Sequence, residues 1–93
     1  INTHAHFDHV LGNAAFVADG VQFVGHANLT AALEASRDYF AERFAAELDG
    51  PASSIVAPGI SVADTLELDL GERSLRLDAV AEAHTAADLT VYD

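Results

Sequence analysis

Apolar and polar positions follow a helical period through the middle of the chain. Between residues 29 and 48 apolar side chains recur every three to four positions, and acidic side chains fall on the opposite side. Asn28 or Thr30 is the predicted N-cap, and Gly50-Pro51 the predicted end. The pattern predicts one long amphipathic helix. Its apolar positions are Leu29, Leu33, Phe40, Phe44 and Leu48, and its solvated acidic positions are Glu34, Asp38 and Glu42.

After residue 60 the period changes to two. Leucines at 66, 68 and 70 alternate with Glu67 and Asp69, Gly71-Glu72 turns the chain, and alternation resumes from residue 75. This predicts a hairpin with one buried face. We expect its second strand to continue to Ala83 and to deliver His84 at its end, with a further strand over residues 89–92.

The first part of the chain gives shorter elements. Residues 1–3 read as the end of a strand, and a short helix follows with Asp8 as its N-cap and Asp19-Gly20 as its stop. Residues 21–24 read as a buried strand, and residues 51–60 as a connecting loop. Helices and strands together indicate an α/β (α+β) class in one segment, residues 1–93.

Composition limits the partners and the metal ligands that this chain can have. The chain begins with Ile1 and contains no methionine, so we expect it to be a piece of a longer protein. Its net charge of -11 disfavours binding to nucleic acid and to anionic membranes. No apolar run approaches the roughly 20 residues needed to span a bilayer. Because the chain has no cysteine, nitrogen and oxygen atoms must hold any metal.

Three of the five histidines, and one aspartate, lie within residues 4–9. Imidazole is the commonest protein ligand for transition metals, and a neighbouring carboxylate adds an oxygen donor. In an extended segment residues two apart point the same way, so His4 and His6 can grip one metal. Asp8 and His9 then come from a turn or helix start, which suits a second metal beside the first.

A third ligand for the first metal must come from elsewhere, because a catalytic zinc usually has three protein ligands and one open position. His84, at a predicted strand end, is the candidate. Asp88 is either an acceptor that orients His84 or a turn residue. His26 also follows a strand, but it lacks a nearby carboxylate and is interpreted as structural.

These residues support a family resemblance. The stretch Asn2-Thr3-His4-Ala5-His6-Phe7-Asp8-His9, followed by Gly12-Asn13, resembles the HxHxDH signature of the metallo-β-lactamase superfamily, and Ala83-His84-Thr85 with Asp88 resembles the segment of its next metal histidine. Residues 13–16 and 65–70 look most similar to the zinc metallohydrolases of quinoprotein relay systems.

The resemblance implies a partial αββα sandwich, with a mixed sheet and helices on one face. It implies that His4, His6 and His84 bind a first zinc and that Asp8 and His9 begin a second site. It also implies a metal-bound hydroxide, oriented by Asp8, that attacks an ester, thioester or amide carbonyl of a small-molecule substrate. This agrees with the general chemistry of zinc, which lowers the pKa of bound water to about 7.

The chain departs from the family pattern at both ends. The family has strands before HxHxDH, and a bridging Asp and a further His after the third histidine. Asp93 follows His84 too closely to be that bridging residue. We therefore expect the N-terminal strands and C-terminal half to be missing, the second site to be incomplete, and the segment to be inactive alone.

Two alternatives stay open. Two histidines and a carboxylate would suit non-haem iron, as in the persulfide dioxygenase branch of the superfamily. The segment would otherwise be a non-catalytic piece that forms homo-oligomers to cover exposed apolar sheet surface.

Overall fold

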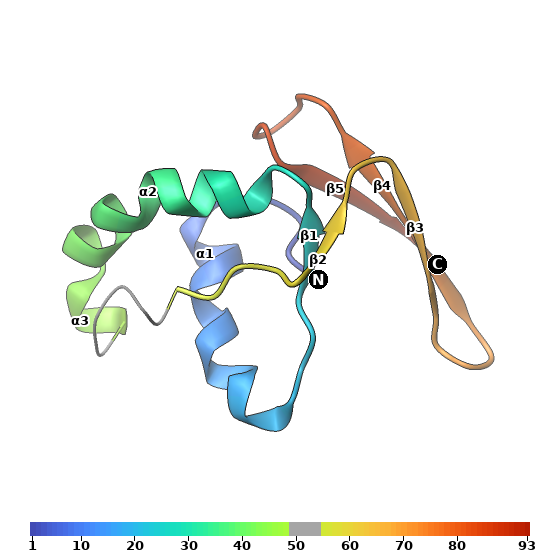
Figure 1. Ribbon diagram of the computed structural model, residues 1–93, viewed down its shortest axis with the longest axis horizontal. Helices are drawn as coiled ribbons and strands as arrows, with labels where there is room; N and C mark the ends of the chain where they lie inside the picture. Colours follow the sequence, from blue (N-terminus) through green and yellow to red (C-terminus); the bar gives the residue numbers. More distant parts are fainter. Residues whose placement is uncertain (49–54) are drawn as a thin grey trace.

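The computed structural model describes residues 1–48 and 55–93 and has an α+β architecture. The elements follow in the order α1 (Phe7–Val10), η1 (Leu11–Asp19), β1 (Val24–His26), α2 (Leu29–Arg43), α3 (Ala45–Leu48), β2 (Ile60–Val62), β3 (Thr65–Asp69), β4 (Ser74–Val80) and β5 (Asp88–Tyr92). Figure 1 shows the helices gathered on one side and the β3–β4–β5 sheet on the other, with β1 and β2 between them.

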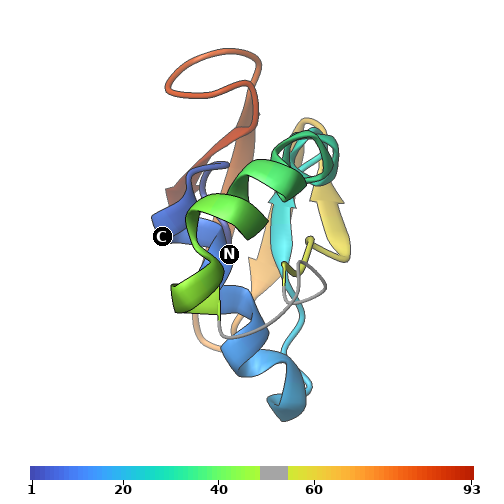
Figure 2. The same ribbon diagram turned by 90° about the vertical axis from the view of Figure 1, so that its left-hand side faces the viewer.

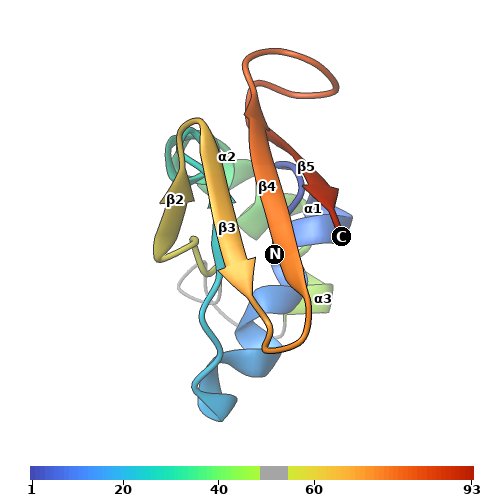
Figure 3. The same cartoon turned by 90° about the vertical axis from the view of Figure 1, so that its right-hand side faces the viewer.

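The strands form two sheets. β1 and β2 pair in parallel, with Val24 opposite Ile60, and α2 lies in the connection between them. β3, β4 and β5 form an antiparallel sheet in that order. Figure 3 shows the long β4 strand between β3 and β5, with β2 beside β3. The α+β class is thus as predicted, with parallel and antiparallel pairing divided between two sheets.

Two hydrophobic clusters hold these layers together. One joins the helices and consists of Val10, Leu29, Leu33, Phe40, Ile55 and Ala87. The other joins the sheets and consists of Val24, Val62, Leu77 and Leu89. Ala87 and Leu89 are two residues apart yet belong to different clusters, so the start of β5 packs against both. The site described below lies near this junction.

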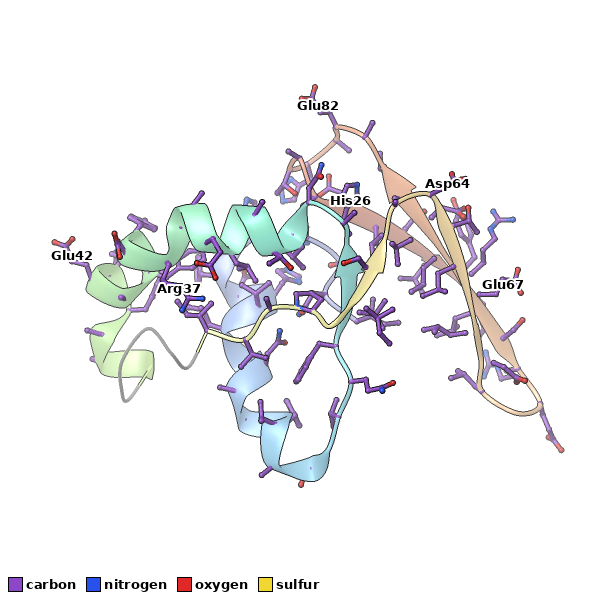
Figure 4. All side chains as sticks on the ribbon, viewed as in Figure 1. His26, Arg37, Glu42, Asp64, Glu67 and Glu82 are labelled. Atoms are coloured by element: carbon purple, nitrogen blue, oxygen red, sulfur yellow. The ribbon has the colours of Figure 1, made fainter. Side chains whose placement is uncertain are left out.

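The hairpin and the last strand are confirmed. Strands β3 and β4 pair from Thr65–Asp78 to Asp69–Ser74, and Gly71 in the turn has a φ of 97°. Leu77 is buried, whereas Leu70 lies beyond β3 and is exposed. Figure 4 shows Glu67 and Glu42 projecting away from the body of the molecule, as expected for solvated positions.

Several predicted boundaries are wrong. Strand β4 ends at Val80, where its pairing with Asp88 closes the ladder, so residues 81–87 form a loop and His84 lies within it. The strand predicted over residues 21–24 begins only at Val24, because β2 supplies pairing partners for Val24–His26. Strand β2 falls partly within the predicted loop 51–60, of which residues 51–54 lie outside the described residues.

The two helical predictions also need correction. The first helix begins after His6, which has extended dihedrals, so Asp8 lies inside the first turn and is not the N-cap; η1 then continues as a 3-10 helix to the left-handed Gly20. The long helix is interrupted at Phe44, whose ring stacks on that of Phe7 with 4.6 Å between centroids. The predicted stop at Gly50-Pro51 lies outside the described residues. No helix in the described part of the chain has the length and apolar character of a membrane span.

Candidate metal centre

The backbone of Asn2 and Thr3 lies at the junction of the two sheets. The Asn2 amide donates to the Val24 carbonyl at 2.8 Å, and the Leu89 amide donates to the Thr3 carbonyl at 2.8 Å. The first bond ties the start of the chain to β1, and the second ties it to β5. The segment carrying His4 and His6 therefore emerges directly beside the start of β5.

The loop over residues 81–87 carries His84 across from β4 to β5. Figure 2 shows this loop as the uppermost part of the molecule, and Figure 4 labels Glu82 on it. Asp88 ties the loop down, because its carboxylate accepts hydrogen bonds from the Thr85 amide at 2.8 Å and the Thr85 hydroxyl at 2.6 Å. The Thr85 hydroxyl in turn accepts from the Ala87 amide at 3.0 Å. The sequence thus builds a compact turn next to His84.

Three imidazole rings meet between these two segments. The ring centroids are 4.9 Å apart for His4 and His6, 4.8 Å for His4 and His84, and 4.6 Å for His6 and His84. One nitrogen from each ring lies within 4.8 Å of the others. Nitrogens bound to a tetrahedral zinc at about 2.0–2.1 Å would be about 3.3 Å apart, so modest side-chain rotation brings them to bonding distance. The donor set therefore fits a zinc ion.

The surroundings of His4 favour the metal-binding form of its ring. Burial, followed by the positive charges that His9, His6 and His84 would carry, lowers the pKa of the His4 imidazole, and the Asp88 carboxylate opposes this. A lower pKa keeps the ring neutral, as a metal ligand must be. His4 Nδ1 lies 3.0 Å from the Thr3 hydroxyl oxygen. A metal at Nε2 would leave Nδ1–H to donate to that oxygen and hold the ring.

Asp88 is an ionised group held by its own turn. Burial would by itself raise the pKa of the Asp88 carboxyl, but hydrogen bonds from the Thr85 side chain and from the Thr85 and His84 amides outweigh burial and lower it. Of the two roles that the sequence left open for Asp88, the structure shows the turn residue. Its bonds hold the backbone at His84 and Thr85 in place. Orientation of the His84 ring by Asp88 stays a prediction.

Asp8 and His9 lie beside the three histidines and not among them. The His9 ring centroid is 3.9 Å from that of His4, and His9 Nε2 is 3.6 Å from an Asp8 carboxylate oxygen. Both side chains are exposed. Within residues 1–48 and 55–93, the group that comes together as a metal site is His4, His6 and His84. A second metal at Asp8 and His9 stays a prediction.

His26 lies outside this group. Its side chain is buried, and its Nδ1 accepts a hydrogen bond from the Asn28 amide at 2.9 Å, next to the start of α2. This contact agrees with the structural role predicted for it.

The sequence did not predict a bonded pair of buried side chains next to the histidine motif. Asn2 and Asn13 are buried and bonded to one another through their side chains. A hint exists at Asn2, because asparagine is disfavoured in strands and this one stands two residues before His4.

Comparison with known proteins agrees with this geometry. The family model of the metallo-beta-lactamase superfamily matches residues 1–93. Neither the curated proteins nor the solved structures that were compared with the chain gave a match. His4 and His6 follow the backbone bond that ties Asn2 to β1, and His84 precedes β5. With the family match over residues 1–93 they lead to one conclusion: the chain belongs to the metallo-β-lactamase superfamily.

Proposed function

We propose that the chain is the metal-binding part of a zinc-dependent hydrolase, with His4, His6 and His84 as ligands of one zinc. One observation carries the proposal: imidazoles from two segments about 80 residues apart meet with their nitrogens within 4.8 Å. The superfamily suggests metal-dependent hydrolysis, which agrees with this ligand set.

The proposed reaction is attack of water on an ester, thioester or amide carbonyl. Bound zinc would polarise the carbonyl and lower the pKa of water to about 7. In this chain His6 and His84 are exposed and His4 is half-buried, so the imidazole group faces solvent on one side and leaves access for a substrate. We propose that Asp8, exposed at the start of α1, holds the attacking water and, with His9, begins a second metal site.

The three histidines are the basis for proposing zinc as the metal. Non-haem iron oxygenases commonly use two histidines and one carboxylate. In the described ranges the residues that gather are three histidines, and the Asp88 carboxylate is engaged by the amide and hydroxyl of Thr85. Three histidines meet the usual ligand number of a catalytic zinc without a carboxylate, and this is the support for zinc as the metal.

The substrate class and the branch belong to the same proposal. A net charge of -11 supports a small-molecule substrate over nucleic acid or an anionic membrane. The sequences of residues 13–16 and 65–70 support the zinc metallohydrolases of quinoprotein relay systems as the branch.

Single-histidine variants test the metal site. Zinc affinity, measured by competition with a chromophoric chelator, is expected to fall at least about 10-fold in His4→Ala and in His84→Ala, because each removes one of three ligands. His26→Asn is the matched control, since it removes an imidazole outside the group and retains an acceptor near the Asn28 amide. Its affinity is expected to equal that of the wild type.

Unchanged zinc affinity in both ligand variants would show that the three histidines do not hold the metal. Metal analysis of the purified protein, together with activity assays, tests the reaction class. Zinc with hydrolysis of a carbonyl substrate supports the proposal. Stoichiometric iron with oxygen uptake on a persulfide would contradict it.

A further inference from the structure

A reciprocal pair of side-chain amides is buried beneath the histidine motif. Asn2 and Asn13 are only 4% and 6% exposed. Asn13 Nδ2 donates to Asn2 Oδ1 at 2.8 Å, and Asn2 Nδ2 donates to Asn13 Oδ1 at 3.1 Å. Each Nδ2 makes one further bond, to the His9 carbonyl at 2.7 Å for Asn2 and to the Val56 carbonyl at 2.9 Å for Asn13. All four amide hydrogens of the pair are therefore used.

These bonds join the two ends of the motif. Asn2 stands two residues before His4, and the carbonyl it binds belongs to His9, the last residue of the motif. The bond closes residues 2–9 into a loop that contains every ligand candidate at this end of the chain. Asn13 then anchors that closed loop to the segment before β2 through Val56.

A buried hydrogen-bonded pair of side chains contributes little more to stability than apolar side chains of the same shape would. Val10 and Leu11 next to it already pack with the cluster that holds α2. Polar groups buried in an interior restrict geometry, because each bond has a narrow range of distance and direction. Burying two amides costs free energy, and their hydrogen bonds hold the start and the end of the motif at a fixed distance.

We propose that the Asn2–Asn13 pair is a positioning device that sets the geometry of His4 and His6 for metal binding, a role that rests on the proposed zinc site. Neither amide is a metal ligand in this proposal. The pair acts through the backbone at His9, which fixes the turn between the strand end and α1.

The test replaces both amides together, with the double variant Asn2→Leu/Asn13→Leu. Replacing both amides leaves neither side chain facing an unsatisfied partner in the pair, whereas removing one would leave the other unsatisfied. The carbonyls of His9 and Val56 each lose one donor in the double variant, so its thermal midpoint is measured together with its zinc affinity. Zinc affinity is expected to fall about 10-fold or more, as for other residues that support metal ligands. Asn13→Ala keeps the Asn2–His9 bond and is expected to show a smaller loss of affinity.

Val62→Ala is the control for stability alone, because Val62 is buried in the sheet cluster and makes no bond to the Asn2–Asn13 pair. Its thermal midpoint is expected to fall while its zinc affinity stays at the wild-type value. Equal losses of affinity in Val62→Ala and the double variant would overturn the positioning role, as would wild-type affinity in a folded double variant.

Amide hydrogen exchange of the metal-free protein separates this inference from the proposed function. Faster exchange in residues 3–10 of the double variant Asn2→Leu/Asn13→Leu, with residues 65–80 unchanged, supports the closed loop even if the wild type binds no zinc, in which case only the proposed function fails. Unchanged exchange in residues 3–10 would overturn the positioning device itself.

Discussion

Asp88 acts on the site through the backbone of the loop between β4 and β5. Its carboxylate accepts from the amide and the hydroxyl of Thr85, directly after His84. The amide of the next residue, Leu89, donates to the Thr3 carbonyl. The turn that holds His84 is therefore fixed relative to the segment that carries His4. One aspartate thus links the two halves of the imidazole group.

The variant Asp88→Asn is expected to lower the free energy of unfolding by about 1–3 kcal/mol at neutral pH, because buried donors lose a charged acceptor. The pKa of Asp88 lies below its ordinary value in the folded state, so its contribution is full above about pH 4 and is lost as the pH falls toward the folded pKa. The stability difference between wild type and variant should therefore shrink below about pH 4.

Urea unfolding of the metal-free protein at a series of pH values measures this difference. Thr90→Val, a change of an exposed β5 residue outside the loop, serves as the control and should show no such trend. A difference that stays constant from neutral pH to about pH 3 would contradict the role assigned to the carboxylate.

The sequence predicted some residues of the candidate site better than others. His4 and His6 were predictable because imidazoles have few structural uses at that spacing and the motif is local. His84 lies far from them in the sequence and was predicted from its place at a strand end and from the family resemblance. The Asn2–Asn13 pair was not, because its bonds span 11 residues to each other and 43 residues to Val56. An asparagine reveals no partner by its type alone.

Among the elements, those defined by local alternation were predicted best. The hairpin of β3 and β4 has a leucine at every second position and a glycine turn, so both strands follow from neighbouring residues. Strands β1 and β2 pair across the whole of α2, and their limits depend on that distant pairing. The β4 boundary was missed for the same reason, since β5 decides where the ladder closes.

The interruption of the long helix also has a tertiary cause. Phe44 has non-helical dihedrals, φ -117° and ψ 26°, and its ring stacks on Phe7 of α1. The apolar period continues through Phe44, so the sequence alone predicts a continuous helix. The contact between Phe44 and Phe7 of α1 accompanies a break in the helix at Phe44.

The β1 strand makes a close approach that requires glycine. A Cβ on Gly25 would lie 2.6 Å from Leu29 Cδ2 and 2.6 Å from Pro58 Cγ, and both neighbours are buried. Gly25→Ala is therefore expected to destabilise the protein by about 1–3 kcal/mol, the usual cost of overpacking. Thermal or urea unfolding checks this value.

Gly12→Ala is the matched control, because a Cβ there meets nothing within 4 Å. Its stability is expected to equal or exceed that of the wild type by up to about 1 kcal/mol. Equal stability of the two alanine variants would show that β1 moves freely away from α2, contrary to the packing described.

The molecule as a whole is flat and acidic. Its principal extents are 40 × 31 × 17 Å, and its net charge is -11. A body only 17 Å thick leaves many side chains without cover, and Phe16, Val17 and Val21 are 55%, 50% and 46% exposed. Val17 and Val21 also line a cleft of about 390 Å³ together with Phe23 and Ile60. Exposed apolar clusters of this kind favour association.

We expect the segment to self-associate in solution, more strongly in high salt, which screens the repulsion between acidic copies. Multi-angle light scattering over a range of protein concentrations measures this. The variant Phe16→Ser/Val21→Ser is expected to shift the population toward monomer, and Ala35→Ser, an exposed change on α2, is the control. A wild-type monomer at every concentration would contradict the expectation.

The most direct measurement of the metal site is X-ray absorption at the zinc edge of the zinc-loaded protein. Three imidazole nitrogens at about 2.0–2.1 Å, with the remaining position taken by oxygen, are the expected shell. In His84→Ala the imidazole number should fall to two. A wild-type shell made of carboxylate and solvent oxygens, or an imidazole number unchanged by His84→Ala, would contradict a zinc site built from His4, His6 and His84.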